Sequence, residues 1–196
     1  MPEQSPITEK SKELMFREYM ENLKLSPEDF EKTILDVGSA EGEFAMWAKE
    51  HGLSDKIYSL DSAAYQENAD NMVRSRAEAL PFKDESFDMT ISDCSMPIML
   101  YEAENSEKSI KEMVSEIIRV TKKNGEIRMA PVPEWRKVDT SWDSSALKLV
   151  NDTFEQEIGT LIKQKRISLD KISLGTSPTD TGNRVENFLY ILKKLG

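Results

Sequence analysis

A chain of 196 residues with 38% hydrophobic and 32% charged side chains has the composition of a globular domain that buries its own core. Its formal charge of −10, from 36 acidic and 26 basic residues, disfavours nucleic acid as a partner, because binding phosphates needs a basic face. No apolar run reaches the roughly 20 residues that cross a bilayer, and the single cysteine cannot form an internal disulfide or a zinc cluster. We therefore expect one cytoplasmic domain spanning residues 1–196, with no membrane span, no nucleic-acid partner and no metal.

Residues 1–30 predict a polar tail and then a helix that Thr8 or Ser11 can cap. The apolar positions expected on one face of this helix are Leu14, Met15, Tyr19, Met20 and Leu23. Two roles stay open for the helix: it packs on the edge of a sheet, or it forms a lid whose Phe16 and Tyr19 cover a ligand. Residues 31–196 are the expected core of the fold.

The stretch TILDVGSAEG, residues 33–42, reads as a strand, a tight turn of small residues and the start of a helix. Small residues at 38, 40 and 42 let the backbone turn sharply and approach a ligand closely. A dinucleotide fingerprint needs glycine at the first, third and sixth positions, which here are Gly38, Ala40 and Glu43. Glu41 and Glu43 would also repel a pyrophosphate at the helix N-terminus. The pattern therefore favours a cationic or zwitterionic nucleoside over NAD.

A second strand, Lys56 to Leu60, ends on Asp61, which lies 23 positions after Gly38. An acid at this place can accept both hydroxyls of a ribose, and it can equally cap a helix from Ser62 onward. A short helix and a third strand near Met72 to Ser75 are expected before the next turn.

A fourth strand, Phe87 to Ser92, delivers Asp93 and Cys94 to the carboxyl edge of the sheet, where open α/β folds bind ligands. Cys94 is expected as a small buried side chain rather than a nucleophile. For Asp93 two interpretations stay open: it orients or deprotonates a substrate, or it only caps the loop.

The remaining chain predicts a helix that starts at Ser106 or Ser109 and ends at Asn124-Gly125, and a fifth strand from Glu126 to Ala130. Pro131 and Pro133 would then open a loop with Trp135 and Trp142, which either line an acceptor pocket or pack on the surface. Another helix follows. The last two strands are expected at Ile167 to Leu174 and Val185 to Leu192, with a bulge at Lys171-Ile172.

Five motifs in order resemble the class I, Rossmann-like S-adenosylmethionine-dependent methyltransferases. They are D-x-G-x-A-x-G from Asp36, Ile57 to Asp61, Ala77 to Phe82, Ser86 to Ser92, and Glu116 to Val120 with Lys123 to Glu126. The resemblance implies an α/β fold: a doubly wound, mostly parallel seven-stranded sheet with one antiparallel strand and helices on both faces. Ala40, where the family usually has glycine, and Arg76, where many relatives have an acid, depart from the pattern.

The resemblance also implies the cofactor, S-adenosylmethionine, and its site. Gly38, Ala40 and Gly42 would follow its amino-acid moiety, Asp36 its ammonium, Asp61 its ribose, and Ala77-Glu78 its adenine. The complete expected cofactor site is Asp36, Gly38, Ser39, Ala40, Gly42, Asp61, Ser62, Arg76, Ala77, Glu78 and Ser92.

The activity that follows is methyl transfer to a small-molecule acceptor by in-line displacement, of the ubiquinone/menaquinone methyltransferase-like type. Such a reaction mainly requires that the nucleophile be held about 3 Å from the methyl group, so a dedicated base is optional. Asp93 is the candidate for orienting the acceptor, with Ser92 and Ser95 beside it. The alternatives are a non-catalytic S-adenosylmethionine-binding regulatory or scaffold protein, and a protein-directed methyltransferase.

Overall fold

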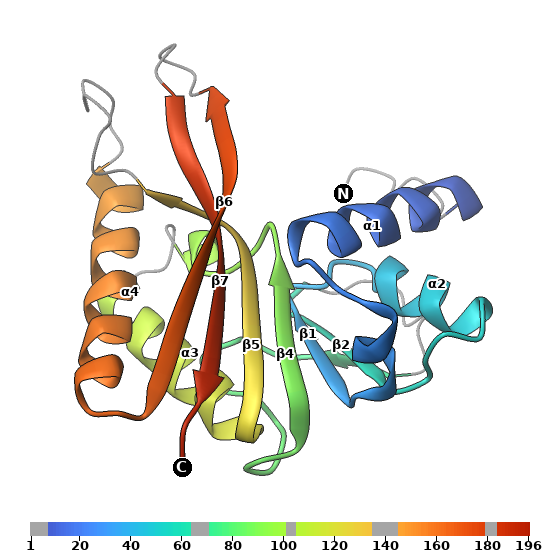
Figure 1. Cartoon of the computed structure of the whole chain (residues 1–196), viewed down its shortest axis with the longest axis horizontal. Helices are drawn as coiled ribbons and strands as arrows, with labels where there is room; N and C mark the ends of the chain where they lie inside the picture. Colours follow the sequence, from blue (N-terminus) through green and yellow to red (C-terminus); the bar gives the residue numbers. More distant parts are fainter. Residues whose placement is uncertain (1–7, 64–70, 101–104, 135–144, 179–183) are drawn as a thin grey trace.

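A computed structural model describes residues 8–63, 71–100, 105–134, 145–178 and 184–196 (Figure 1). Seven strands form one sheet in the order β3-β2-β1-β4-β5-β7-β6. The strands are β1 (Ile34–Val37), β2 (Ile57–Asp61), β3 (Met72–Arg74), β4 (Phe87–Asp93), β5 (Thr121–Glu134), β6 (Ile167–Pro178) and β7 (Arg184–Lys194). Only β7 runs against its neighbours β5 and β6. The expected doubly wound, mostly parallel sheet with one antiparallel strand is thus confirmed.

Helices cover the two faces of the sheet. On one face lie α1 (Glu9–Asn22) and α2 (Glu43–Glu50), and on the other α3 (Ser106–Val120) and α4 (Ser145–Lys163) (Figure 1). Short 3-10 helices, η1 (Pro27–Glu31) and η2 (Ile98–Leu100), precede β1 and follow β4. No helix in the described ranges is both long and apolar enough to span a membrane.

The alternation of side chains along β1 decides on which face of the sheet each side chain lies. All four residues of β1 are buried, as expected of a central strand covered on both sides. Leu35 and Val37 pack in the core beneath α3 and α4, whereas Ile34 packs in the core beneath α1 and α2. Because successive side chains point to opposite faces, Asp36 must point to the face of α1. The same rule places Asp93 there, since Met89 and Ile91 of β4 belong to that core.

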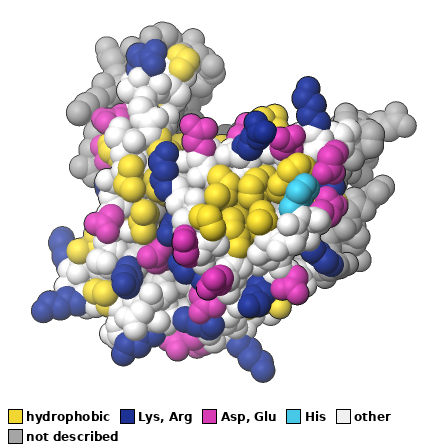
Figure 2. Space-filling model, turned by 45° about the vertical axis from the view of Figure 1, so that its right-hand side comes forward, with side chains coloured by type: hydrophobic (Ala, Val, Ile, Leu, Met, Phe, Trp, Pro, Cys, Tyr) yellow, Lys and Arg dark blue, Asp and Glu magenta, His cyan; other side chains and the backbone are white. Residues whose placement is uncertain are grey.

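Aromatic side chains join α1 to α2. The Phe16 ring stacks on Phe30 and Phe44 at centroid distances of 5.8 and 5.6 Å, and Tyr19 stacks on Phe44 at 4.4 Å. The exposed His51 stacks on Trp47 at 3.8 Å, and Figure 2 shows a hydrophobic area beside this single histidine. Helix α1 therefore packs against α2, and Leu14, which is 57% exposed, does not lie on its buried face as expected.

Several expected boundaries are wrong. Helix α3 ends at Val120, and Asn124-Gly125 lies within β5 instead of ending the helix. Pro131 and Pro133 continue β5 rather than opening a loop, because the register shifts between Met129 and Val132 and so removes the need for a donor at Pro131. In β6 the register shift falls between Ser173 and Gly175, not at residues 171–172. The helix expected after Asp61 lies outside the described residues. Trp135 and Trp142 lie outside them as well.

Arg119 of α3 holds the segment that leads into β4. Its guanidinium donates to the backbone oxygens of Leu80 and Phe82 at 3.0 and 2.7 Å. It also forms ion pairs with Glu116 and Asp84 at 2.7 and 2.8 Å, and Glu116 in turn accepts from the Leu80 amide at 2.8 Å. The guanidinium thus makes five hydrogen bonds, two of them to Glu116, and these fix the turn against α3.

We expect Arg119→Met to lower the free energy of unfolding by about 1–3 kcal/mol, because two backbone oxygens lose their charged donor. Urea denaturation measures this loss. Arg119→Lys should recover only part of it, since an ammonium group cannot reach all of these acceptors at once. A Lys variant as stable as the wild type would contradict the role given to the guanidinium.

Candidate active site

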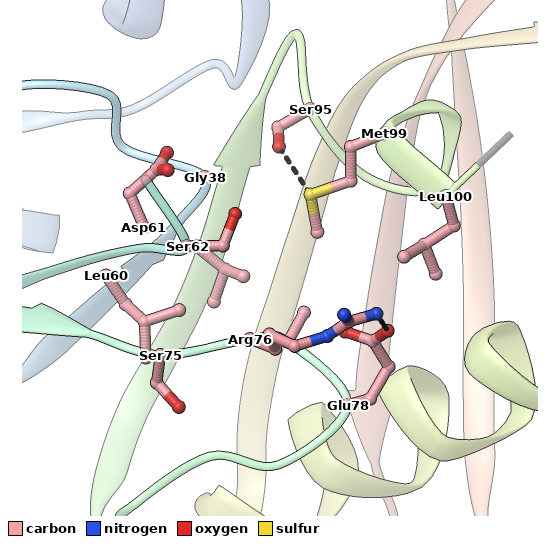
Figure 3. A pocket seen from close by; sticks show the side chains of 12 residues that line it. Gly38, Leu60, Asp61, Ser62, Ser75, Arg76, Glu78, Ser95, Met99 and Leu100 are labelled. Atoms are coloured by element: carbon pink, nitrogen blue, oxygen red, sulfur yellow. Dashed lines mark hydrogen bonds and ion pairs between the residues drawn. The ribbon is translucent and has the colours of Figure 1, made fainter. Parts of the chain in front are cut away.

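A cavity of about 430 Å³ opens at the carboxyl ends of β1, β2 and β4, and its size falls in the range of ligand pockets (Figure 3). Its walls come from four segments, each of which follows a strand. The lining residues are Val37, Gly38, Leu60, Asp61, Ser62, Ser75, Arg76, Ala77, Glu78, Ser95, Met99 and Leu100.

The turn after β1 is held in a left-handed backbone conformation at three positions. Gly38, Ala40 and Gly42 have φ values of +79°, +50° and +80°. The amides of Gly38 and Ser39 donate to the Leu60 oxygen at 2.8 and 3.1 Å, which ties the turn to the end of β2. Glycine adopts such angles freely, whereas alanine at position 40 costs about 1–2 kcal/mol.

Gly38 is also a point of close approach. A Cβ atom added there would lie 1.9 Å from the Ser95 Oγ and 2.5 Å from its Cβ. The Ser95 hydroxyl donates to the Met99 sulfur at 3.0 Å, so the segment after β4 packs directly on the glycine turn (Figure 3).

Asp61 ends β2 and organises both neighbouring turns. One carboxylate oxygen accepts from the Ala40 amide at 3.1 Å and the other from the Ala63 amide at 2.8 Å. The Asp61 backbone oxygen accepts from the Ser75 amide at 2.9 Å. Each carboxylate oxygen keeps a further lone pair, so the side chain can still accept hydroxyl donors from the cavity.

At the opposite end of the cavity Arg76 pairs with Glu78 at 2.5 Å (Figure 3). Burial raises the pKa of Glu78, but the hydrogen bond and charge of Arg76, together with further hydrogen bonds, outweigh it, and the net pKa lies below the usual range. Arg76 is exposed and Ala77 is buried at 3%.

Asp36 is the most completely buried charged group of the site, with an exposed fraction of 0%. Its Oδ1 accepts from the Tyr19 hydroxyl at 3.2 Å, and its Oδ2 has no hydrogen-bond partner. Burial raises the pKa of Asp36 well above its ordinary value, and the nearby Asp93 and Asp61 raise it further. Burial likewise raises the pKa of Tyr19, so its hydroxyl remains a donor.

Asp93, 6% exposed at the end of β4, accepts from the Asn22 amide nitrogen at 3.0 Å on Oδ1 and 3.3 Å on Oδ2. Burial raises the pKa of Asp93 to about 6. Cys94 is exposed, which corrects the expectation of a buried side chain, and its backbone is left-handed at φ +51°. Partial desolvation and the Asp93 charge raise the pKa of the Cys94 thiol to about 11, which makes it a poor nucleophile.

The structure gathers only part of the expected site around the cavity. Gly38, Asp61, Ser62, Arg76, Ala77 and Glu78 line it. Asp36, Ser39, Ala40, Gly42, Ser92 and Asp93 are not among its lining residues. Ser39 is buried with an unpartnered hydroxyl, and Ser92 accepts from the Met96 amide at 3.0 Å. Sequence reasoning missed Ser75, Met99 and Leu100 as lining residues, although their positions after strand ends were a usable signal.

A glycine turn after β1, an acid at the end of β2 and a cavity at the carboxyl edge of this sheet define the class of Rossmann-like nucleoside-binding enzymes. Residues 35–129 match the family described as "Methyltransferase domain". This match covers just under half of the chain and supports S-adenosylmethionine-dependent methyltransferase activity. No curated protein matches it in a sequence search.

Solved structures share the fold at low sequence identity. A SAM-dependent methyltransferase from Methanosarcina mazei is 18% identical with a TM-score of 0.54, covering 93% of this chain and 97% of that one. A SAM-dependent methyltransferase from Thermotoga maritima is 17% identical with a TM-score of 0.54, covering 94% and 91%. The YcgJ protein from a Bacillus is 15% identical with a TM-score of 0.51, covering 96% and 100%.

We expect Gly38→Ala to abolish binding of S-adenosylhomocysteine in calorimetry, because the new methyl group meets Ser95 in a backbone conformation that alanine avoids. Ala40→Gly is the matched control in the same turn, and it should keep binding and raise the free energy of unfolding by about 0.5 kcal/mol. Undiminished binding by Gly38→Ala would show that the turn does not need its close approach.

Proposed function

We propose that this methyltransferase acts on a small-molecule acceptor in the cytoplasm, with the cofactor in the cavity between β1, β2 and β4 and the acceptor beside Asp93. The observation that carries the proposal is the placement of Asp36, Asp61 and Asp93 at the carboxyl ends of the adjacent strands β1, β2 and β4, where Asp61 lines the cavity and Asp36 keeps one oxygen without a partner. The acidic charge of −10 supports a small molecule over nucleic acid.

The residues present fit S-adenosylmethionine. Gly38 lines the cavity without a side chain that would displace Ser95, and the orphaned Oδ2 of Asp36 is an acceptor suited to a cationic group. Asp61 and Ser62 offer acceptors at a ribose position, and the segment from Ser75 to Glu78 would hold the base. When bound, the cofactor supplies an electrophilic methyl group on a positively charged sulfur.

The chain's own residues would then orient the acceptor. Asp93 is the group with a pKa suited to this task, because a carboxylate with a pKa of about 6 is ionised at neutral pH and is still a better base than an ordinary one. The Thermotoga maritima relative is described as a possible histamine N-methyltransferase, and a small acceptor of this kind supports the proposal.

Asp61→Ala is expected to abolish cofactor binding and turnover together, since it removes the ribose acceptor and the anchor of the Ala40 amide. A thermal-shift titration with S-adenosylmethionine and S-adenosylhomocysteine measures binding. The folded wild type should be stabilised by either ligand. At a ligand concentration of about 100 times a micromolar Kd, linkage predicts about 2.7 kcal/mol of stabilisation. An unchanged melting temperature at that concentration would refute the site.

Asp93→Asn should leave cofactor affinity nearly intact, reduce methyl transfer and change the pH dependence of stability. The folded-state pKa of Asp93 lies above that of the unfolded chain, so its charge destabilises the fold as the pH rises through about 6. The variant should therefore be about 1–3 kcal/mol more stable than the wild type at pH 8. Urea denaturation at pH 4 and pH 8 tests this. Equal differences at both pH values would argue against a buried ionised carboxylate.

The small-molecule assignment has its own test. Labelled methyl transfer into a metabolite extract should exceed transfer into purified RNA or protein. Efficient labelling of a protein with no labelled metabolite would instead favour a protein-directed methyltransferase.

A further inference from the structure

Helix α1 reaches both buried acids that face it. Tyr19 and Asn22 are three residues apart, so their side chains lie on one side of the helix. Tyr19 donates to Asp36 at the end of β1, and Asn22 donates to Asp93 at the end of β4. The helix therefore bridges the cofactor side and the acceptor side of the proposed site.

The Asn22 amide makes a particular kind of contact. Its nitrogen lies 3.0 Å from one Asp93 oxygen and 3.3 Å from the other, so it engages the whole carboxylate edge. A donor shared between both oxygens restricts rotation of the carboxylate about its terminal bond. The lone pairs that Asn22 does not use remain available to a second donor.

We propose that Asn22 is a positioning residue for methyl transfer: it holds the Asp93 carboxylate in the orientation in which one oxygen accepts the proton of the methyl acceptor. This inference rests on the proposed function, because it assumes that the acceptor lies beside Asp93. The proton moves from the acceptor heteroatom to a carboxylate oxygen, which leaves a neutral carboxylic acid and an acceptor with a free electron pair.

The groups around Asp93 shift its pKa in opposing directions. From α1, the Asn22 hydrogen bond lowers the Asp93 pKa and the Glu18 carboxylate raises it, while Cys94 lowers it through a hydrogen bond from its own strand end. Tyr19 of α1 and Asp36 of β1 interact electrostatically with Asp93 as well. On the β5 side its register partner is Ala130, which carries no charge. Asn22 and Glu18 are thus two α1 side chains with opposite effects on the pKa of Asp93.

The experiment compares Asn22→Leu and Glu18→Gln with Asn71→Leu as the matched control. Asn71 donates its amide to the backbone oxygens of Asp55 and Ile57, at 3.0 and 3.4 Å, and makes no contact with Asp93 in the described chain. The first readout is the carbon-13 NMR titration of the Asp93 carboxyl in protein without cofactor, identified by its loss in Asp93→Asn. The second is the pH profile of kcat with a labelled-methyl assay, together with calorimetric cofactor affinity.

Asn22→Leu should raise the Asp93 titration midpoint by about one pH unit, because a hydrogen bond to the charged form is lost. Glu18→Gln should lower the midpoint, and Asn71→Leu should leave it unchanged. The acid limb of kcat should move with the midpoint, so kcat of Asn22→Leu should fall more at pH 6 than at pH 8, with cofactor Kd changed less than twofold. The loss that remains at pH 8 reports the lost orientation of the carboxylate.

A midpoint that stays fixed in Asn22→Leu would overturn the inference, whatever happens to activity. A kcat loss of equal size at every pH would also overturn it, because it would indicate a merely structural role. A midpoint that moves as expected in a protein that methylates no acceptor would refute the proposed function and confine Asn22 to tuning the Asp93 charge.

Discussion

Two carboxylates buried side by side against α1 are the constraint on which the rest of the site depends. Asp36 and Asp93 are 0% and 6% exposed, and neither has an ion-pair partner among the described residues. Removing a carboxylate from water without a counter-charge is costly, and hydrogen bonds from Tyr19 and Asn22 offset only part of that cost. The position of α1 is therefore part of the electrostatics of the site and not only of its packing.

The burial of these acids has two opposing energetic effects. A desolvated, partly unsatisfied acid destabilises the folded chain, but the same desolvation strengthens its attraction for a cation, because little water competes for the charge. The Asp36 oxygen without a partner is the sharpest case. A positive charge placed beside this oxygen would offset part of the desolvation cost.

The sequence predicted the features that depend on local pattern. The strand, turn and helix around Gly38 and the acid at Asp61 follow from periodicity, small residues and spacing. The class of sheet follows from the resemblance of five ordered motifs to a known family, and the structure confirms it. The contact of Asn22 with Asp93 could not be predicted, because these residues are 71 positions apart and meet only when α1 packs on the sheet. The extension of β5 through Pro131 was missed for a similar reason. A proline reads as a break locally, and only pairing with β7 shows that its absent donor is not needed.

The four walls of the cavity differ in how firmly they are held. The turns after β1 and β2 are tied together by backbone bonds to Leu60 and by the carboxylate of Asp61, and the turn leading to Leu80 is fixed by Arg119 and Glu116. The wall after β4 instead presents side chains, and the Ser95 hydroxyl and the flexible Met99 thioether make a weak hydrogen bond with each other. Backbone positions cannot change without disturbing the sheet, whereas side chains can change rotamer and leave the sheet intact. Three walls of the cavity are therefore fixed by backbone hydrogen bonds, whereas the wall after β4 can change its shape by rotation of the Ser95 and Met99 side chains.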